Sequence, residues 1–168
     1  MSGGLPATIE PILLAERGAR LTGTLPLAGM SRLAESCADR QGSVEIDLQF
    51  DRSGDAKVYE ARGVVQVTAR VTCQRCLEPM AISLTVRPQW LFVRQGEGRE
   101  TPLDDVAEII EVDRPVALSE MVEDELLLAM PMIPMHSLDE CPARQYSAAG
   151  KERENPFAGL KGRKPGPG

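Results

Sequence analysis

The stretch VTCQRCLEP, residues 71–79, places two cysteines at Cys-x-x-Cys spacing between two runs that alternate like β-strands. A second pair of metal-ligand residues lies downstream, where His136, the only histidine of the chain, stands five positions before Cys141. Structural zinc sites take four nitrogen or sulfur ligands, and a tight Cys-x-x-Cys turn presents two thiolates to one ion. We therefore predict a closed structural zinc site with the ligands Cys73, Cys76, His136 and Cys141.

Two other interpretations of this turn stay open. Cys73 and Cys76 can be small residues of an ordinary turn, with His136 as a loop side chain. A thiol redox protein can also use the Cys73/Cys76 pair, and a disulfide between them at the cytosolic redox potential would indicate that function. Redox motifs of this kind open a helix in a βαβ unit, whereas the alternating runs on both sides of this turn predict a hairpin.

Apolar and polar residues alternate over three runs around the turn, residues 43–50, 57–72 and 82–92. A period of two is typical of β-strands with one buried face. Consecutive runs joined by short turns predict an antiparallel meander whose second connection carries the cysteines. Gly63 marks an expected bulge in the middle run, and Pro88 marks an expected bend or exposed edge in the third.

Two segments carry apolar residues at helical spacing. They are residues 30–40 and residues 119–130, with Ser119 as the expected N-cap of the second helix and Pro131 at its end. We therefore predict an α+β fold, with an antiparallel β-rich sheet or small barrel, two helices and a zinc knuckle. The expected core residues are Val44, Ile46, Leu48, Val65, Val67, Val71, Leu84 and Leu127.

The length of 168 residues and a hydrophobic content of 42% suit one domain with one core. We expect this domain to span residues 1–142, with residues 1–18 loose, and residues 143–168 to form a flexible polar tail. No apolar run approaches the roughly 20 residues of a membrane helix. The four cysteines fit reduced thiols. We expect a cytoplasmic protein with no membrane association.

Acidic residues are concentrated in one part of the chain. The net charge is −6, and residues 97–125 alone carry 11 acidic and 2 basic residues. A protein that binds nucleic acid through its phosphates usually has a basic surface. The charge pattern therefore predicts that any nucleic-acid role runs through a protein partner or a small local patch, and it predicts no binding to DNA. A solvated loop and helix face is the other interpretation of the acidic stretch.

Several pieces of the sequence, taken in order, match a known family. They are CQRCLEP at residues 73–79, MVEDELLLAMP at residues 121–131, PMH at residues 134–136 with Cys141, and NPF at residues 155–157 followed by Leu160. Together they resemble the YceD family, which is named for accumulation of large-subunit ribosomal RNA, over residues 32–160. The resemblance implies a cytoplasmic bacterial factor needed for synthesis, processing or stability of the 23S ribosomal RNA.

The resemblance also implies a partner, either a large-subunit ribosomal precursor or an assembly protein. Whether RNA is contacted directly stays open. If it is, we expect the contact to use the basic tail at Lys161, Arg163 and Lys164, or the strand residues Arg62, Arg70 and Arg75.

We expect no enzymatic activity. The sequence has no serine–histidine–aspartate set, no second histidine and no phosphate-binding glycine-rich loop. The alternative from another class is an RNA-processing enzyme, in which acidic residues between Asp104 and Glu125 bind a catalytic metal ion.

Overall fold

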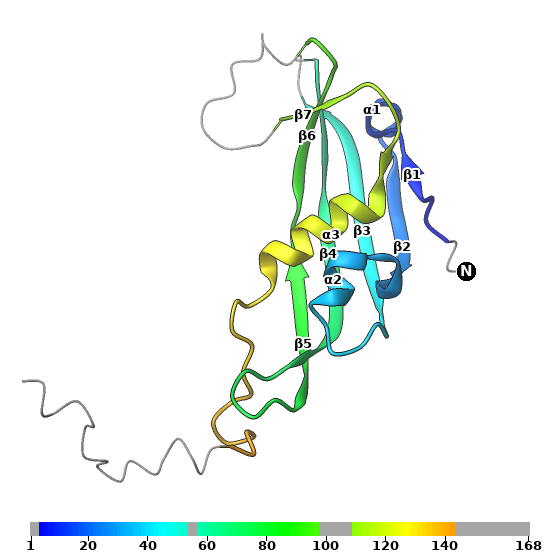
Figure 1. Cartoon of the computed structure of the whole chain (residues 1–168). Coiled ribbons are helices and arrows are strands. Elements are labelled where there is room, and N and C mark those ends of the chain that lie inside the picture. Colours follow the sequence, from blue (N-terminus) through cyan, green and yellow to red (C-terminus); the bar gives the residue numbers. More distant parts are fainter. Residues whose placement is uncertain (1–3, 54–56, 98–108, 144–168) are drawn as a thin grey trace, which may run out of the picture.

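The structure is a computed structural model that describes residues 4–53, 57–97 and 109–143. Its main feature is a six-stranded β-sheet with helices on one face (Figure 1). A separate short sheet pairs β1 (Thr8–Ile9) with β8 (Val116–Ala117). The predicted α+β class is confirmed. The strands of the large sheet are β2 (Arg20–Pro26), β3 (Ser43–Ser53), β4 (Val58–Thr72), β5 (Pro79–Val86), β6 (Gln89–Arg94) and β7 (Ile109–Val112).

The long strand β4 organises the large sheet. One edge of β4 pairs with β3, and the other edge pairs first with β6 and then, toward Thr72, with β5. All pairs of the large sheet are antiparallel except β6 and β7, which are parallel. Among the described strands no pairing joins β2 to β7, so the sheet is open. Of the two forms expected from the sequence, the structure has the sheet and not the small barrel.

Strand β3 shows how the alternating pattern forms the core. Val44 lies opposite Val67 of β4, and side chains directly opposite each other point to the same face of a sheet. That face packs against the helices in one continuous core. Of the eight predicted core residues, Leu127 is half-buried and packs against the core, and the other seven are buried. The buried apolar residues of β3 are Val44, Ile46, Leu48 and Phe50.

Gly63 lies in β4 directly opposite Leu48, and the pairing of β3 with β4 runs through it without an extra residue. The bulge predicted at this position was therefore wrong. A Cβ atom at residue 63 would overlap the backbone carbonyl of Asp47. Glycine is needed here because the backbone of β3 approaches closely.

Three helices cover the buried face of the sheet, α1 (Pro11–Glu16), α2 (Ser31–Glu35) and α3 (Leu118–Ala129), together with the 3-10 helix η1 (Leu27–Gly29) (Figure 1). Helix α2 is shorter than the predicted helix over residues 30–40. The N–H of Ala38 donates to the carbonyl of Arg70 at 2.6 Å. This bond to β4 takes the chain out of the helix.

Helix α3 begins one residue earlier than predicted. Ala117 is its N-cap residue, and no side chain forms a capping hydrogen bond. The N–H of Leu118 donates to the carbonyl of Ala7 at 3.2 Å, so the chain before β1 satisfies one of the free N–H groups at the helix start. The capping role expected of Ser119 was wrong because β8 leads directly into the helix.

The predicted domain limits stay a prediction. Within residues 1–18, β1 and α1 bring Ile9 and Ala15 into the core. Of the predicted tail, the structure describes Ala143 alone. No helix in the described ranges has both the length and the apolar character needed to cross a membrane.

Candidate metal centre

The four residues predicted as zinc ligands come together at one end of the sheet. The ligand atoms of Cys73, Cys76, His136 and Cys141 all lie within 4.8 Å of one another. Tetrahedral Zn²⁺ with bonds of about 2.3 Å places two sulfur ligands about 3.8 Å apart, so this spread is close to that of one coordination sphere. Cys73 and Cys141 are buried, and Cys76 and His136 are half-buried.

The connection between β4 and β5 holds the first two ligands. The N–H of Cys73 donates to the carbonyl of Glu78 at 2.9 Å, and the N–H of Leu77 donates back to the carbonyl of Cys73 at 2.9 Å. Leu77 has φ of 63° and is the one non-glycine residue with positive φ in the described ranges. The left-handed conformation of Leu77 closes the tight turn that directs both thiols to one side.

The segment after α3 brings the other two ligands to this turn (Figure 1). Pro131 and Pro134 keep the segment out of a helix. The N–H of Gln74 donates to the carbonyl of Pro134 at 2.8 Å, and the N–H of His136 donates to Sγ of Cys73 at 3.4 Å. Two main-chain contacts therefore place His136 beside the cysteine turn.

Ionisation of the thiols differs within the cluster. Burial by itself raises the pKa of Cys73, but backbone N–H groups of Cys76, His136 and Arg75 stabilise its thiolate and lower the pKa to about 5. Burial raises the pKa of Cys76, and the neighbouring thiols of Cys73 and Cys141 raise it further. Three sulfur atoms this close cannot all carry negative charge without a cation among them. A divalent cation with thiolate affinity fits this donor set.

Arg75 links the two halves of the cluster, and the sequence pattern gave no signal for this role. Its Nη2 lies 3.6 Å from Sδ of Met135. Its Nη1 is buried without a hydrogen-bond partner among the described residues. The contact with Met135 joins the β4–β5 turn to the segment after α3.

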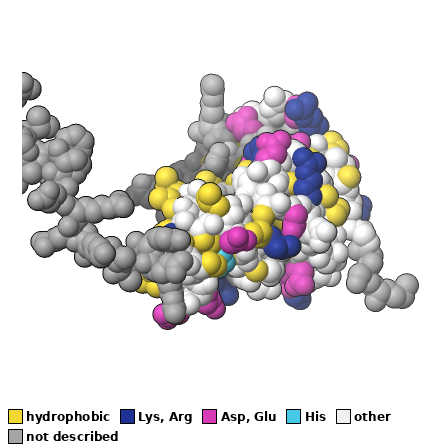
Figure 2. Space-filling view, turned by 60° about the horizontal axis from the view of Figure 1, so that its bottom comes forward, with side chains coloured by type: hydrophobic (Ala, Val, Ile, Leu, Met, Phe, Trp, Pro, Cys, Tyr) yellow, Lys and Arg dark blue, Asp and Glu magenta, His cyan; other side chains and the backbone are white. Residues whose placement is uncertain are grey.

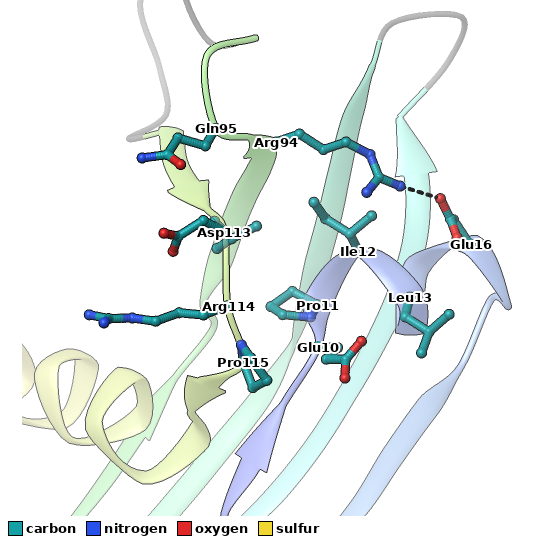
Figure 3. Close-up of a pocket in the computed structure, with 11 residues that line it drawn as sticks. Glu10, Pro11, Ile12, Leu13, Glu16, Arg94, Gln95, Asp113, Arg114 and Pro115 are labelled. Atoms are coloured by element: carbon teal, nitrogen blue, oxygen red, sulfur yellow. Dashed lines mark hydrogen bonds and ion pairs between the residues drawn. The ribbon is translucent and has the colours of Figure 1, made fainter.

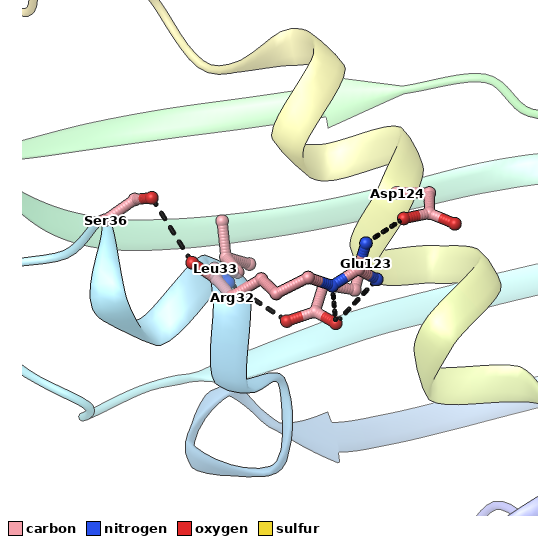
Figure 4. A network of polar contacts seen from close by, with 5 residues as sticks. All are labelled: Arg32, Leu33, Ser36, Glu123 and Asp124. Carbon is pink, nitrogen blue, oxygen red and sulfur yellow. Dashed lines mark hydrogen bonds and ion pairs between the residues drawn. The ribbon is translucent and has the colours of Figure 1, made fainter.

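Three of the four acidic residues of α3 are engaged in structural contacts, and Figure 4 shows those of Glu123 and Asp124. Glu123 is buried and accepts hydrogen bonds from the side chain of Arg32 and from the N–H of Leu33. Asp124 accepts from Nη1 of Arg32 at 2.6 Å, and Glu125 accepts from the indole N–H of Trp90 at 2.9 Å. These contacts hold α3 on α2 and β6, and they leave the α3 acids less available for a catalytic metal ion.

A pocket of about 500 Å³ lies at the opposite end of the sheet, between α1 and the chain around β7 (Figure 3). Arg94 and Glu16 form an ion pair of 2.8 Å at its rim. Glu10, Asp113 and Arg114 also line it, whereas the lining contains no histidine, cysteine or serine. Among the described residues, the pocket therefore brings together acidic and basic side chains but no thiol or imidazole, whereas the Cys/His cluster gathers four metal-ligand side chains.

The fold and the cluster define a small α+β protein with a group of three thiols and one imidazole that could bind a metal ion. The chain belongs to the YceD family, because the family model described as large ribosomal RNA subunit accumulation protein YceD matches residues 61–162. A protein of the same description from Haemophilus influenzae is 32% identical, over 93% of this chain and 94% of its own length. No solved structure matches the chain. The resemblance seen in the sequence is confirmed.

Proposed function

We propose that this protein is a non-enzymatic factor for ribosome biogenesis, needed for synthesis, processing or stability of the 23S ribosomal RNA. The observation that carries this proposal is the family match together with the relative from Haemophilus influenzae, whose description names accumulation of the large ribosomal RNA subunit. The relative aligns along nearly its whole length, so the comparison covers both parts of the Cys/His cluster. The proposed site of action is the cytoplasm, where bacterial ribosomes assemble.

The proposed role of the Cys/His cluster is structural. A bound Zn²⁺ would neutralise the thiolates and join the β4–β5 turn to the segment after α3, so that metal binding contributes to folding free energy. The ligand set Cys73, Cys76, His136 and Cys141 supplies all four positions of a tetrahedral site. Such a site leaves no open position at which substrate can react, which supports a non-enzymatic function.

The proposed partner is a protein or a ribonucleoprotein, either a large-subunit precursor or an assembly protein. The net charge of −6 opposes binding to naked RNA and favours basic protein surfaces. Direct RNA contact, through Arg62 and Arg70 of β4 or the basic residues 161–164, involves few charges. It is therefore expected to be weak and to fall steeply with salt concentration. Arg75, expected on a strand, lies in the β4–β5 turn and is half-buried.

A gene deletion tests the proposed function. We expect the deletion to lower the amount of 23S relative to 16S ribosomal RNA, and a plasmid copy of the wild-type gene to restore it. An unchanged ratio in the deletion strain would contradict the proposal. Copurification of large-subunit precursors with the tagged protein, with and without nuclease, then separates partners held through protein from partners held through RNA.

A thiol redox protein is the second candidate, because the low pKa of Cys73 gives a reactive thiolate when no metal is bound. Mass spectrometry of the protein after rapid alkylation in cells distinguishes the two. A Cys73–Cys76 disulfide that forms and disappears with cellular redox state supports the redox candidate. Fully reduced cysteines with bound zinc support the structural role.

A further inference from the structure

Exposed hydrophobic side chains lie on the β4–β5 turn and along the chain from the last turn of α3 to Cys141. Seven large hydrophobic residues are exposed in the described ranges, and all but Leu13 lie in these two segments. Met132 is 99% exposed and Leu128 is 85% exposed. Figure 2 shows this end of the molecule, with hydrophobic side chains beside the one histidine. We call this surface the knuckle patch; it consists of Leu77, Leu128, Met132, Ile133, Met135 and Leu138.

The backbone holds these side chains outward. Leu126 faces the core, which directs Leu128, two positions later on the helix, to the opposite side. Pro131 and Pro134 keep the following segment out of a helix, so Met132 and Ile133 have no helix face against which to pack. Several exposed apolar side chains close together along the chain, unlike single scattered residues, indicate an interaction site.

The charges around the patch indicate which kind of partner fits it. The turn over residues 73–79 and the segment over residues 126–143 contain three acidic residues, Glu78, Asp139 and Glu140, and one basic residue, Arg75. An acidic border repels phosphate and attracts lysine and arginine side chains. Methionine and leucine side chains adapt their shape to an amphipathic helix or an extended apolar segment. A nucleic acid therefore fits this surface poorly, and a basic protein segment fits it well.

We propose that the knuckle patch is the docking surface for a basic amphipathic segment of a partner protein. Apolar side chains of that segment pack on Leu128, Met132 and Ile133, and its basic side chains face the acidic border. This inference rests on the proposed function only in taking the partner to be a protein. It adds the surface and the chemistry by which the partner is recognised.

Binding to a synthetic probe tests the proposal. The probe is a fluorescent 18-residue helical peptide of leucine and lysine, and the control peptide has glutamate in place of lysine. Fluorescence anisotropy with the full-length, zinc-loaded protein should show binding of the lysine peptide and at least tenfold weaker binding of the glutamate peptide. Leu128→Asp should weaken binding of the lysine peptide at least tenfold. Leu13→Asp, at the exposed leucine outside the patch, should leave it unchanged.

Several outcomes would overturn the proposal. If Leu13→Asp and Leu128→Asp weaken binding of the lysine peptide equally, the peptide does not recognise the patch. The same conclusion follows if the protein binds the lysine and glutamate peptides equally well. If the protein binds a single-stranded RNA oligonucleotide more tightly than the lysine peptide, and Leu128→Asp abolishes that RNA binding, the ligand is a nucleic acid. Sedimentation of the wild type as a dimer that Leu128→Asp dissociates would identify a second copy as the occupant.

The chain itself supplies one further control, because Phe157 and Leu160 stand directly before the basic residues 161–164. If the double variant Phe157→Ser/Leu160→Ser binds the peptide and the wild type does not, the occupant is this chain's own segment and the proposal of an external partner fails. If the occupant is a segment of a partner protein, the wild type and the double variant should bind the lysine peptide equally well.

The patch and the proposed function fail in different experiments. If Leu128→Asp restores 23S ribosomal RNA in the deletion strain as well as the wild type does, the patch has no role in that function. If the deletion leaves 23S ribosomal RNA unchanged, the proposed function fails while peptide binding still reports on the patch.

Discussion

Arg32 and Glu123 stand 91 positions apart in the sequence, and two hydrogen bonds join them, from Nε and Nη2 of the arginine to Oε2 of the glutamate at 3.0 and 2.9 Å. The other carboxylate oxygen of Glu123 accepts the N–H of Leu33 at 3.0 Å. The glutamate is 4% exposed. A buried carboxylate with every oxygen bonded is a strong link between α2 and α3.

Replacement of Glu123 by alanine should destabilise the protein. The change leaves the N–H of Leu33 and the Nε and Nη2 groups of Arg32 without their acceptor, which costs about 1–3 kcal/mol. Urea denaturation, followed by circular dichroism, measures the change in unfolding free energy. Glu120→Ala, at an exposed position of the same helix, should change stability by no more than about 0.5 kcal/mol. Equal effects of the two changes would show that the buried contacts do not contribute.

Metal analysis should find about one Zn²⁺ per chain in protein purified without a chelator, held by a closed four-ligand site. Cys76→Ser should lose the metal and melt at a lower temperature, because binding free energy at a structural site is also folding free energy. Addition of a chelator to the wild type should lower its melting temperature to a similar extent. Cys37→Ser, at the cysteine outside the cluster, should keep the metal. Full thermal stability of Cys76→Ser would contradict a structural zinc site.

Stability of the metal-free protein should depend on pH through Cys73. The pKa of this thiol falls from 9.0 to about 5 in the folded protein. A folded-state pKa below the unfolded value means that the thiolate stabilises the fold fully above about pH 9, and that this contribution is lost as pH falls toward 5. Urea denaturation with chelator at pH 6 and pH 8 should therefore show higher stability at pH 8.

Cys73→Ala provides the comparison for that experiment. Its unfolding free energy should rise less than that of the wild type between pH 6 and pH 8. The two proteins share all other titrating groups, so the difference reports on the Cys73 thiol. The same gain in both proteins would show that the Cys73 thiolate does not stabilise the fold.

Gly63→Ala should destabilise the sheet. The added Cβ overlaps the backbone of β3 at Asp47, and overpacking of a close contact costs about 1–3 kcal/mol or more. Gly29→Ala is the matched change, because the nearest atom to its Cβ is a side-chain carbon of Pro26 at 3.8 Å. Chemical denaturation of the two variants should differ by at least about 1 kcal/mol. Equal stability would show that β3 shifts freely to accept a side chain at residue 63.

Much of the fold and the ligand set could be predicted because the signals are local. The alternation around Val44 and Val67 reflects the geometry of a strand with one buried face, which repeats every two residues wherever the strand lies. The spacing of Cys73 and Cys76 likewise reflects the geometry of a single turn. Their pairing with His136 and Cys141 could be predicted because zinc chemistry requires four ligands and the chain offers few others.

Other features were decided by contacts between distant segments. Residue 63 is glycine because the backbone of Asp47 and Leu48 leaves no room for a Cβ atom. Helix α2 ends before Ala38, whose N–H bonds to the carbonyl of Arg70. The open sheet, with β7 parallel to β6, depends on which edges meet after the whole chain has packed.

Local sequence patterns were sufficient to predict the strands around the cysteine turn, the helix that ends before Pro131 and the four residues of the Cys/His cluster. Only contacts within the folded chain make Glu123 a buried link and not a solvated acid, and only they leave Leu128 and Met132 exposed. The physical reason is that periodicity and turn chemistry act within a few residues of the chain. Burial and hydrogen bonding depend on neighbours that only the folded chain brings together.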